Sequence, residues 1–88
     1  MDTVVIDVRE PFEFAEGRVK GALNIPPDRL MSGATEINGL DKNTPIIVYC
    51  RTGSRSNVAM HILSQLGFTN IKNGINKDQV EARFLHQN

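Results

Sequence analysis

The sequence of 88 residues contains a single cysteine, Cys50. One cysteine cannot form a disulfide within the chain or supply a metal site built from several thiolates. Two distant histidines, His61 and His86, add too few ligands for any other metal site, so we expect neither a metal nor a cofactor. Cys50 is therefore either a small apolar residue of the core or a reactive thiol, and the residues around it distinguish the two.

An excess of one charge and a long apolar run are also lacking. Lys plus Arg and Asp plus Glu number ten each, so we expect neither nucleic acid nor an anionic membrane as the main partner. The longest apolar run, Ile46 to Cys50, is far shorter than the roughly 20 residues that span a bilayer. No signal-like segment precedes Asp2, which favours the cytoplasm, although a periplasmic protein would look the same after removal of an export signal.

Neither repeats nor low-complexity segments nor linkers divide the chain. Its length suffices for one compact unit with a modest core. We therefore expect a single domain over residues 1–88, and we expect it to be a monomer.

Four segments have the character of strands. Residues 3–8 carry a β-branched run that is apolar on both faces, as in a parallel strand covered on two sides. Ile46 to Cys50 follows a turn cluster and predicts the clearest and most central strand. Residues 21–25 and 69–72 predict two shorter strands, the first of them stopped by a pair of prolines.

Helical signals lie between these segments. A proline near the start, acids in the first turn and a glycine after the end predict a short helix over residues 10–17. Residues 28–40 are expected to form one or two helical turns, and Asp78 with Glu81 resembles a capping box at the start of a last helix. The alternation predicts an α/β domain with a mostly parallel central sheet flanked by helices on both faces.

The strongest helical pattern covers residues 54–67. The apolar residues that fall at helical spacing and are predicted to face the core are Val58, Ala59, Ile62, Leu63 and Leu66. His61 falls on the opposite side, so we expect it to be a solvated surface residue, and we expect the same of the other histidine.

Cys50 ends the central strand and is followed by a very short loop. Only residues 51–53 separate it from the next helix, so the backbone must turn sharply around the sulfur. Gly53 permits such a turn, and successive amide groups can point inward as an anion nest. The positive end of the helix and the charges of Arg51 and Arg55 also favour the thiolate. We therefore expect the pKa of Cys50 to lie below the value of about 8.5 for a free cysteine.

Ligands of open parallel sheets bind beyond the carboxyl ends of the strands. Asp7 and Arg9 end the first predicted strand and Cys50 and Arg51 end the central one, so both pairs are expected at one edge of the sheet. The acids of the first helix are expected to be surface charges, one of which could pair with a loop arginine. These acids are Glu10, Glu13 and Glu16.

Three segments, taken in order, resemble the rhodanese domain. They are Ile6 to Pro11 with Phe14, Gly21 to Pro26, and Val48 to Ser56. The chain is most similar to short single-domain bacterial rhodaneses of the phage-shock-protein-E type. The resemblance runs from about Val4 to Gly74, and it departs from the family where Arg18 replaces a frequent histidine and where a frequent glycine pair is reduced to Gly74.

The resemblance implies a sulfurtransferase. The Cys50 thiolate would take the outer sulfur of thiosulfate, release sulfite, and pass the sulfur from a persulfide to cyanide or another thiophilic acceptor, such as a thiol or a protein. Arg51 and Arg55 would receive the oxyanion, while Asp7 and Arg9 would brace the loop. The substrate-binding residues implied in this way are Arg51, Thr52, Gly53, Ser54 and Arg55.

Two other functions are weighed against this one. Cysteine phosphatases and arsenate reductases need a Cys-x5-Arg loop that encloses a tetrahedral anion, whereas only four residues separate Cys50 from Arg55. A non-catalytic rhodanese-like binding module is the other alternative, and the presence of the cysteine together with both arginines weighs against it.

Overall fold

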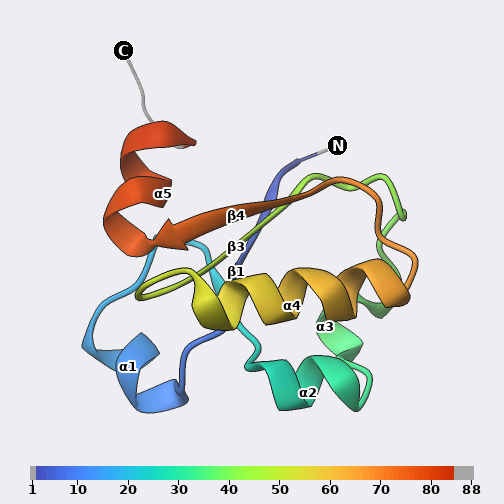
Figure 1. Cartoon of the computed structure of the whole chain (residues 1–88), viewed down its shortest axis with the longest axis horizontal. Helices are drawn as coiled ribbons and strands as arrows, with labels where there is room; N and C mark the ends of the chain where they lie inside the picture. Colours follow the sequence, from blue (N-terminus) through green and yellow to red (C-terminus); the bar gives the residue numbers. More distant parts are fainter. Residues whose placement is uncertain (1, 85–88) are drawn as a thin grey trace.

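In the computed structural model, residues 2–84 are described, and they form a domain around one four-stranded sheet (Figure 1). The strand order is β2-β1-β3-β4 and each neighbouring pair is parallel, which confirms the predicted α/β class. The central position predicted for the third strand is also confirmed. The strands are β1 (Val4–Asp7), β2 (Leu23–Asn24), β3 (Ile46–Cys50) and β4 (Ile71–Asn76).

Helices fill the connections between the strands. Residues 28–40 do form short helices, as the sequence predicted, and none of the helices within residues 2–84 is long and apolar enough to cross a membrane. The helices are α1 (Pro11–Glu16), α2 (Pro27–Met31), α3 (Thr35–Asn38), α4 (Ser54–Gln65) and α5 (Lys77–Arg83).

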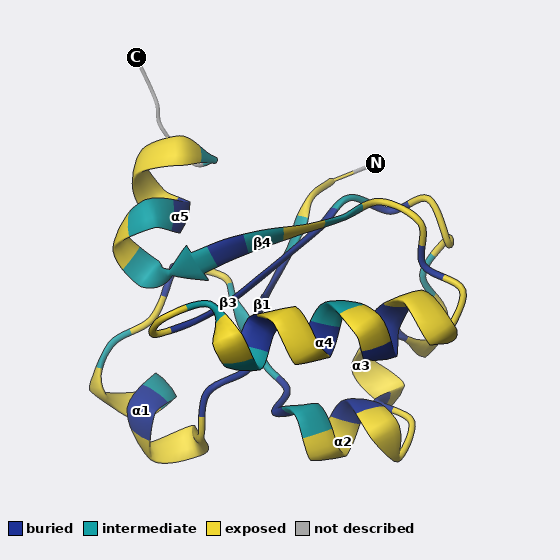
Figure 2. Cartoon of the chain, in the orientation of Figure 1, coloured by how far each residue is buried: buried dark blue, intermediate teal, exposed yellow. Residues whose placement is uncertain are grey.

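The sheet separates two apolar clusters, one on each face. Ile46, Val48 and Cys50 of β3 pack with residues of α2, α3 and α4, while Ile47 and Tyr49 point to the other side and pack with α5. Figure 2 shows the buried positions running along the strands and along one side of α4. Helices on both faces are thus confirmed, and the alternation along β3 directs Cys50 toward the face that α4 covers.

The buried side of α4 contains three of the five residues predicted to face the core. Ala59, Ile62 and Leu63 are buried on the stripe that contacts the sheet, as predicted, whereas Val58 and Leu66 are exposed. Val58 lies too far around the helix from this stripe, and Leu66 follows the last residue of α4. His61 is exposed, as predicted.

The boundary between β4 and α5 was also predicted incorrectly. β4 continues to Asn76, well beyond the predicted residues 69–72, and α5 begins at the next residue. The side chain of Asn76 caps α5 by accepting a hydrogen bond from the Gln79 amide at 2.9 Å, in place of the capping box predicted at Asp78 and Glu81. The extended backbone of Asn76 suits this capping role.

β4 carries one extra residue opposite β3. The register shifts after Val48, and Gly74 lies at the shift. A Cβ added to Gly74 would collide with Val80 and would lie 2.9 Å from Ile47 Cγ2, so only glycine fits. Ile75, the next residue, has a φ of 74°, a left-handed conformation that is rare for a β-branched side chain. The single glycine at this point is therefore demanded by close packing between β4, β3 and α5.

Candidate active site

The sulfur of Cys50 lies at the carboxyl edge of the sheet, inside the loop that follows β3. Cys50 is 2% exposed, and its sulfur accepts a hydrogen bond from the Gly53 amide at 3.1 Å. Ser56 Oγ lies 3.5 Å from the sulfur and is itself buried. Gly53 has a φ of 94°, the left-handed conformation that the short loop requires. The predicted turn around the sulfur is therefore present.

The environment of the sulfur favours its ionised form. Burial raises the pKa of the Cys50 thiol, but hydrogen bonds from the Ser56 hydroxyl and from the amides of Ser56, Gly53 and Thr52 outweigh burial and lower the pKa to about 7. The direction agrees with the expectation from the sequence. The cause of the lowered pKa differs in part from the expected one. The Ser56 hydroxyl contributes more than the arginine charges, and the sequence did not point to this residue.

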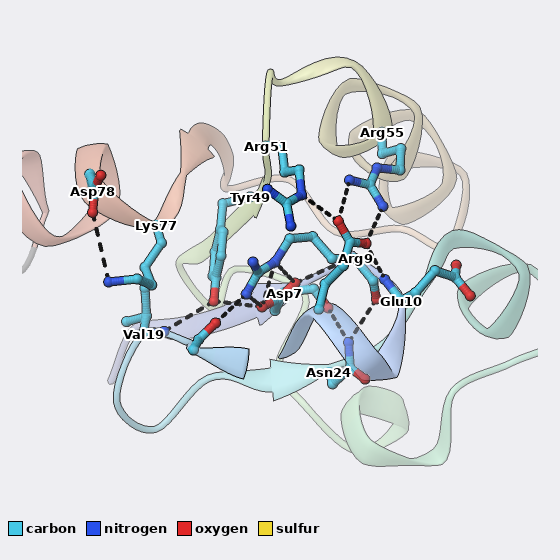
Figure 3. A network of polar contacts seen from close by, with 12 residues as sticks. Asp7, Arg9, Glu10, Val19, Asn24, Tyr49, Arg51, Arg55, Lys77 and Asp78 are labelled. Atoms are coloured by element: carbon cyan, nitrogen blue, oxygen red, sulfur yellow. Dashed lines mark hydrogen bonds and ion pairs between the residues drawn. The ribbon is translucent and has the colours of Figure 1, made fainter. Parts of the chain in front are cut away.

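A buried carboxylate holds both loop arginines. Glu13 of α1 is 5% exposed, and it accepts a hydrogen bond from Arg51 Nε at 2.6 Å and another from Arg55 Nη1 at 2.6 Å. Figure 3 shows the side chains of Arg51 and Arg55, whose hydrogen bonds both end on Glu13. The two arginines hold the pKa of Glu13 well below its usual range. Glu13 is thus the acid that pairs with the loop, and its assignment to the surface was wrong.

The two arginines are used differently. Arg55 directs both Nη atoms to Glu13, whereas Arg51 contributes only Nε, and its side chain is 59% exposed. A hollow of about 250 Å³ opens beside the sulfur, and Arg51 lines it while Arg55 does not. The hollow is lined by Arg9, Cys50, Arg51, Asn76, Lys77 and Asp78.

The side chains of Thr52 and Ser54 are not among those lining the hollow. Both residues are exposed, and their hydroxyl groups lie 3.2 Å from each other. The Thr52 amide is one of the groups that lower the pKa of Cys50. Within the loop, the backbone of residues 52–53 and the side chain of Arg51 are therefore the parts that face the sulfur or the hollow.

Asp7 and Arg9 form a buried ion pair beneath the site. Arg9 Nη2 lies 2.7 Å from Asp7 Oδ2, and the Tyr49 hydroxyl donates to the same oxygen at 2.7 Å (Figure 3). Arg9 Nη2 also donates to the Gly17 carbonyl at 2.6 Å. Burial raises the pKa of Tyr49 to about 12, so its hydroxyl remains a donor. The pair thus connects β1 to the end of α1 and to the residue before Cys50.

Bracing by Asp7 and Arg9 is therefore indirect. No hydrogen bond is found from either side chain to residues 51–53 within the described part of the chain; the contact with β3 runs through Tyr49. Arg9 additionally lines the hollow, which the sequence did not predict. The role of Tyr49 could not be predicted from the sequence, because Tyr49 lies within an apolar strand.

Other candidate residues stay away from this edge of the sheet. Residues 2–84 hold no group of three or more His, Cys, Asp or Glu side chains placed to bind a metal ion. His61 lines a larger hollow of about 590 Å³ between α4 and the start of β4, which contains no residue of the cysteine loop. His86 lies outside the described residues.

Comparison with known proteins agrees with this architecture. The Rhodanese-like domain family matches residues 1–77. The thiosulfate sulfurtransferase PspE of Escherichia coli is 41% identical over 69 residues, which cover 77% of this chain and 64% of that protein. A putative mitochondrial thiosulfate sulfurtransferase of Schizosaccharomyces pombe is 37% identical over 81 residues, which cover 81% of this chain and 57% of that protein. The chain thus spans less than two thirds of either relative.

Solved structures show the same fold. A rhodanese with anions from E. coli superposes with a TM-score of 0.77 at 33% identity, covering 89% of this chain and 91% of that one. A nearly buried cysteine in a hydrogen-bonded loop, at the carboxyl edge of a parallel sheet, defines the class of site. The chain belongs to the rhodanese-like domain family, as its three motifs predicted, and its similarity to PspE is confirmed.

The pH dependence of alkylation tests the ionisation of Cys50. Because the thiolate is the reactive form, the rate of reaction with iodoacetamide should rise with pH through a midpoint at about 7. Cys50→Ser should not react, which establishes that Cys50 is the residue modified. A midpoint at or above about 8.5, the value of a free cysteine, would show that the loop does not stabilise the anion.

Substitution of Glu13 tests the link between α1 and the loop. Glu13→Gln should lower the melting temperature at neutral pH, because two arginines lose their partner. The pKa of Glu13 is lowered in the folded protein, so its contribution is complete above its ordinary pKa of about 4.3 and declines as the pH falls toward the folded value. The difference between the two proteins should therefore shrink below about pH 4.

Thermal unfolding followed by circular dichroism at about pH 7 and about pH 3 measures this difference. Glu16→Gln, an exposed position on the same helix, is the matched control and should have little effect at either pH. An equal loss at both pH values would show that Glu13 stabilises the protein without its charge.

Proposed function

We propose that the protein is a sulfurtransferase that accepts sulfane sulfur from thiosulfate or a related anionic donor onto Cys50 and passes it to cyanide or another thiophilic acceptor. One observation carries the proposal: the sulfur of Cys50 is nearly buried and lies 3.1 Å from the Gly53 amide and 3.5 Å from the Ser56 hydroxyl, contacts that lower the pKa of the thiol to about 7. The names of two relatives, both thiosulfate sulfurtransferases, support the same class of reaction.

The proposed reaction has two displacement steps at sulfur. In the first, the Cys50 thiolate attacks the outer sulfur of thiosulfate; a sulfur–sulfur bond to Cys50 forms while the one in thiosulfate breaks, and its electron pair leaves with sulfite. In the second, cyanide attacks the outer sulfur of the persulfide, thiocyanate leaves, and the thiolate is restored. The donor sulfur is already at the oxidation level of the product, so neither step needs an oxidant or a reductant.

The hollow beside Cys50 suits an anionic donor. Arg51 keeps its Nη groups free of Glu13, and the cations of Arg9 and Lys77 line the same space. Lys77 is partly neutralised, since its ammonium lies 3.7 Å from Asp78 and 3.4 Å from Glu81. Arg51 is therefore the residue that we assign to the oxyanion, whereas Arg55 positions the loop through Glu13.

Phosphate chemistry is disfavoured by the same geometry. A phosphatase loop needs its arginine to bind the equatorial oxygens of the phosphoryl group. Here both Nη atoms of Arg55 donate hydrogen bonds to Glu13, and only four residues separate Arg55 from Cys50. A purely structural binding module would not need a cysteine of lowered pKa, so sulfur transfer accounts for more of the observed features.

Substitution of Arg51 tests the assignment. Arg51→Ala should raise the KM for thiosulfate in thiosulfate:cyanide transfer roughly tenfold or more, because a hydrogen bond to a charged group contributes about 1.5–3 kcal/mol. Alkylation of Cys50 by a neutral reagent should persist. Arg29→Ala removes an exposed arginine that pairs with Glu36 and serves as the matched control.

The same assay includes Cys50→Ala, which should transfer no sulfur, and a parallel measurement of aryl-phosphate hydrolysis, which should be absent. An unchanged KM in Arg51→Ala would refute the role of Arg51. Efficient phosphate hydrolysis by the unaltered protein would refute the function itself.

A further inference from the structure

Asn73 of β4 is bonded to the cysteine loop and to the helix that follows it. Its Oδ1 accepts a hydrogen bond from Ser56 Oγ at 2.7 Å and one from the Ile75 amide at 2.9 Å. Its Nδ2 donates to the Gly53 carbonyl at 3.1 Å. The chemistry described above does not use this side chain, yet it contacts two of the residues whose groups surround the sulfur.

The hydroxyl of Ser56 lies between Asn73 and Cys50. The Ser56 hydroxyl carries a single proton, which it donates to Asn73 in the observed geometry. The thiol form of Cys50 can therefore donate its own proton to Ser56 Oγ. When Cys50 ionises, the hydroxyl can rotate its proton toward the sulfur. Asn73 Oδ1 then still keeps the Ile75 amide as a donor, so the rotation leaves no buried acceptor unpaired.

The other contact of Asn73 is less consequential for the sulfur. The Gly53 carbonyl also accepts the Asn57 amide at 3.0 Å, so it keeps a partner when Nδ2 is removed. The Gly53 amide, which donates to Cys50, belongs to the preceding peptide unit. Any effect of Asn73 on the sulfur should therefore run through Ser56.

We propose that Asn73 is a positioning residue that holds the Ser56 proton while Cys50 is a thiol and competes with the thiolate for that proton. The strained backbone of Ile75 agrees with this role, because its left-handed conformation turns its amide onto the same Asn73 oxygen. The inference rests on the proposed function only in so far as the thiolate is the attacking form.

Charged groups around Cys50 are left in place by substitutions at Asn73. Arg51 and Arg55 come from the loop and the start of α4, and Glu13 of α1 pairs with both. Arg9 follows β1, and α5 contributes charges of both signs. The charged side chains facing the sulfur or its immediate neighbours are Arg9, Glu13, Arg51, Arg55, Lys77 and Asp78.

The test is the midpoint of iodoacetamide alkylation against pH in four proteins: the unaltered chain, Asn73→Ala, Ser56→Ala and the double variant. Ser56→Ala should raise the midpoint by about one pH unit, the size expected for one hydrogen bond to an anion, whereas Asn73→Ala should lower it, because the acceptor that competes with the thiolate for the Ser56 proton is gone. The double variant should have the same midpoint as Ser56→Ala, since Asn73 acts through Ser56. Additive shifts, or no downward shift in Asn73→Ala, would overturn the proposal.

Asn70→Ala is the matched control, because the Asn70 side chain contacts Asn43 and not the loop. If the alkylation midpoint of this control shifts as much as that of Asn73→Ala, loss of any side-chain hydrogen bond near β4 alters the pKa of Cys50. That result would also overturn the proposal. Circular dichroism establishes that each variant is folded.

A second variant keeps the proposal testable if Asn73→Ala does not fold. Asn73→Asp retains the oxygen that accepts from Ser56 and Ile75, and its charge acts on the sulfur through space whether or not Ser56 is present. The carboxylate introduced by Asn73→Asp also binds the proton of the Ser56 hydroxyl, and this effect adds to the shift of the alkylation midpoint only when Ser56 is present. The shift should therefore be larger with Ser56 than with Ala at that position, and equal shifts would refute the proposal. No sulfur donor is used, so these results are independent of whether thiosulfate is the substrate.

Discussion

An anion held at an almost buried position is the constraint on which the other features of this protein depend. A thiolate with so little contact with water must exchange hydration for hydrogen bonds from the protein. The short loop after β3 supplies them, because Gly53 adopts a left-handed conformation and turns its amide toward the sulfur at 3.1 Å. The hydroxyl of Ser56 approaches the sulfur from α4. Sheet, loop and helix thus meet at one atom.

The two arginines near this atom are bound by Glu13 to different extents. Glu13 occupies both Nη atoms of Arg55 and ties the start of α4 to α1, so that arginine is a structural part of the loop. Arg51 shares the same carboxylate through Nε alone and keeps the rest of its guanidinium group at the hollow. Below them, Asp7 and Arg9 fix the position of Tyr49, the residue before the nucleophile. The charges nearest to Cys50 therefore maintain the geometry of the loop, and the Nη groups of Arg51 remain outside the pairing with Glu13.

Features that depend on neighbouring residues in the chain could be predicted from the sequence. The strand that ends at Cys50, the turn at Gly53 and the helix from Ser54 are set by local periodicity and by glycine, and all three are present. The roles of Glu13 and Asn73 could not be predicted, because their partners lie 38 or 42 positions away for Glu13 and 17 or 20 positions away for Asn73. The exposure of Val58 and Leu66 could not be predicted either, since apolar spacing alone does not fix how a helix is rotated on its sheet.

The proposed role of Cys50 as a carrier of sulfur is tested most directly by intact mass spectrometry after treatment with thiosulfate. We expect a mass increase of one sulfur atom, which disappears on reduction and does not form in Cys50→Ser, because Cys50 is the only thiol in the chain. Failure to form the adduct, or an adduct that also forms in Cys50→Ser, would show that Cys50 does not carry sulfur.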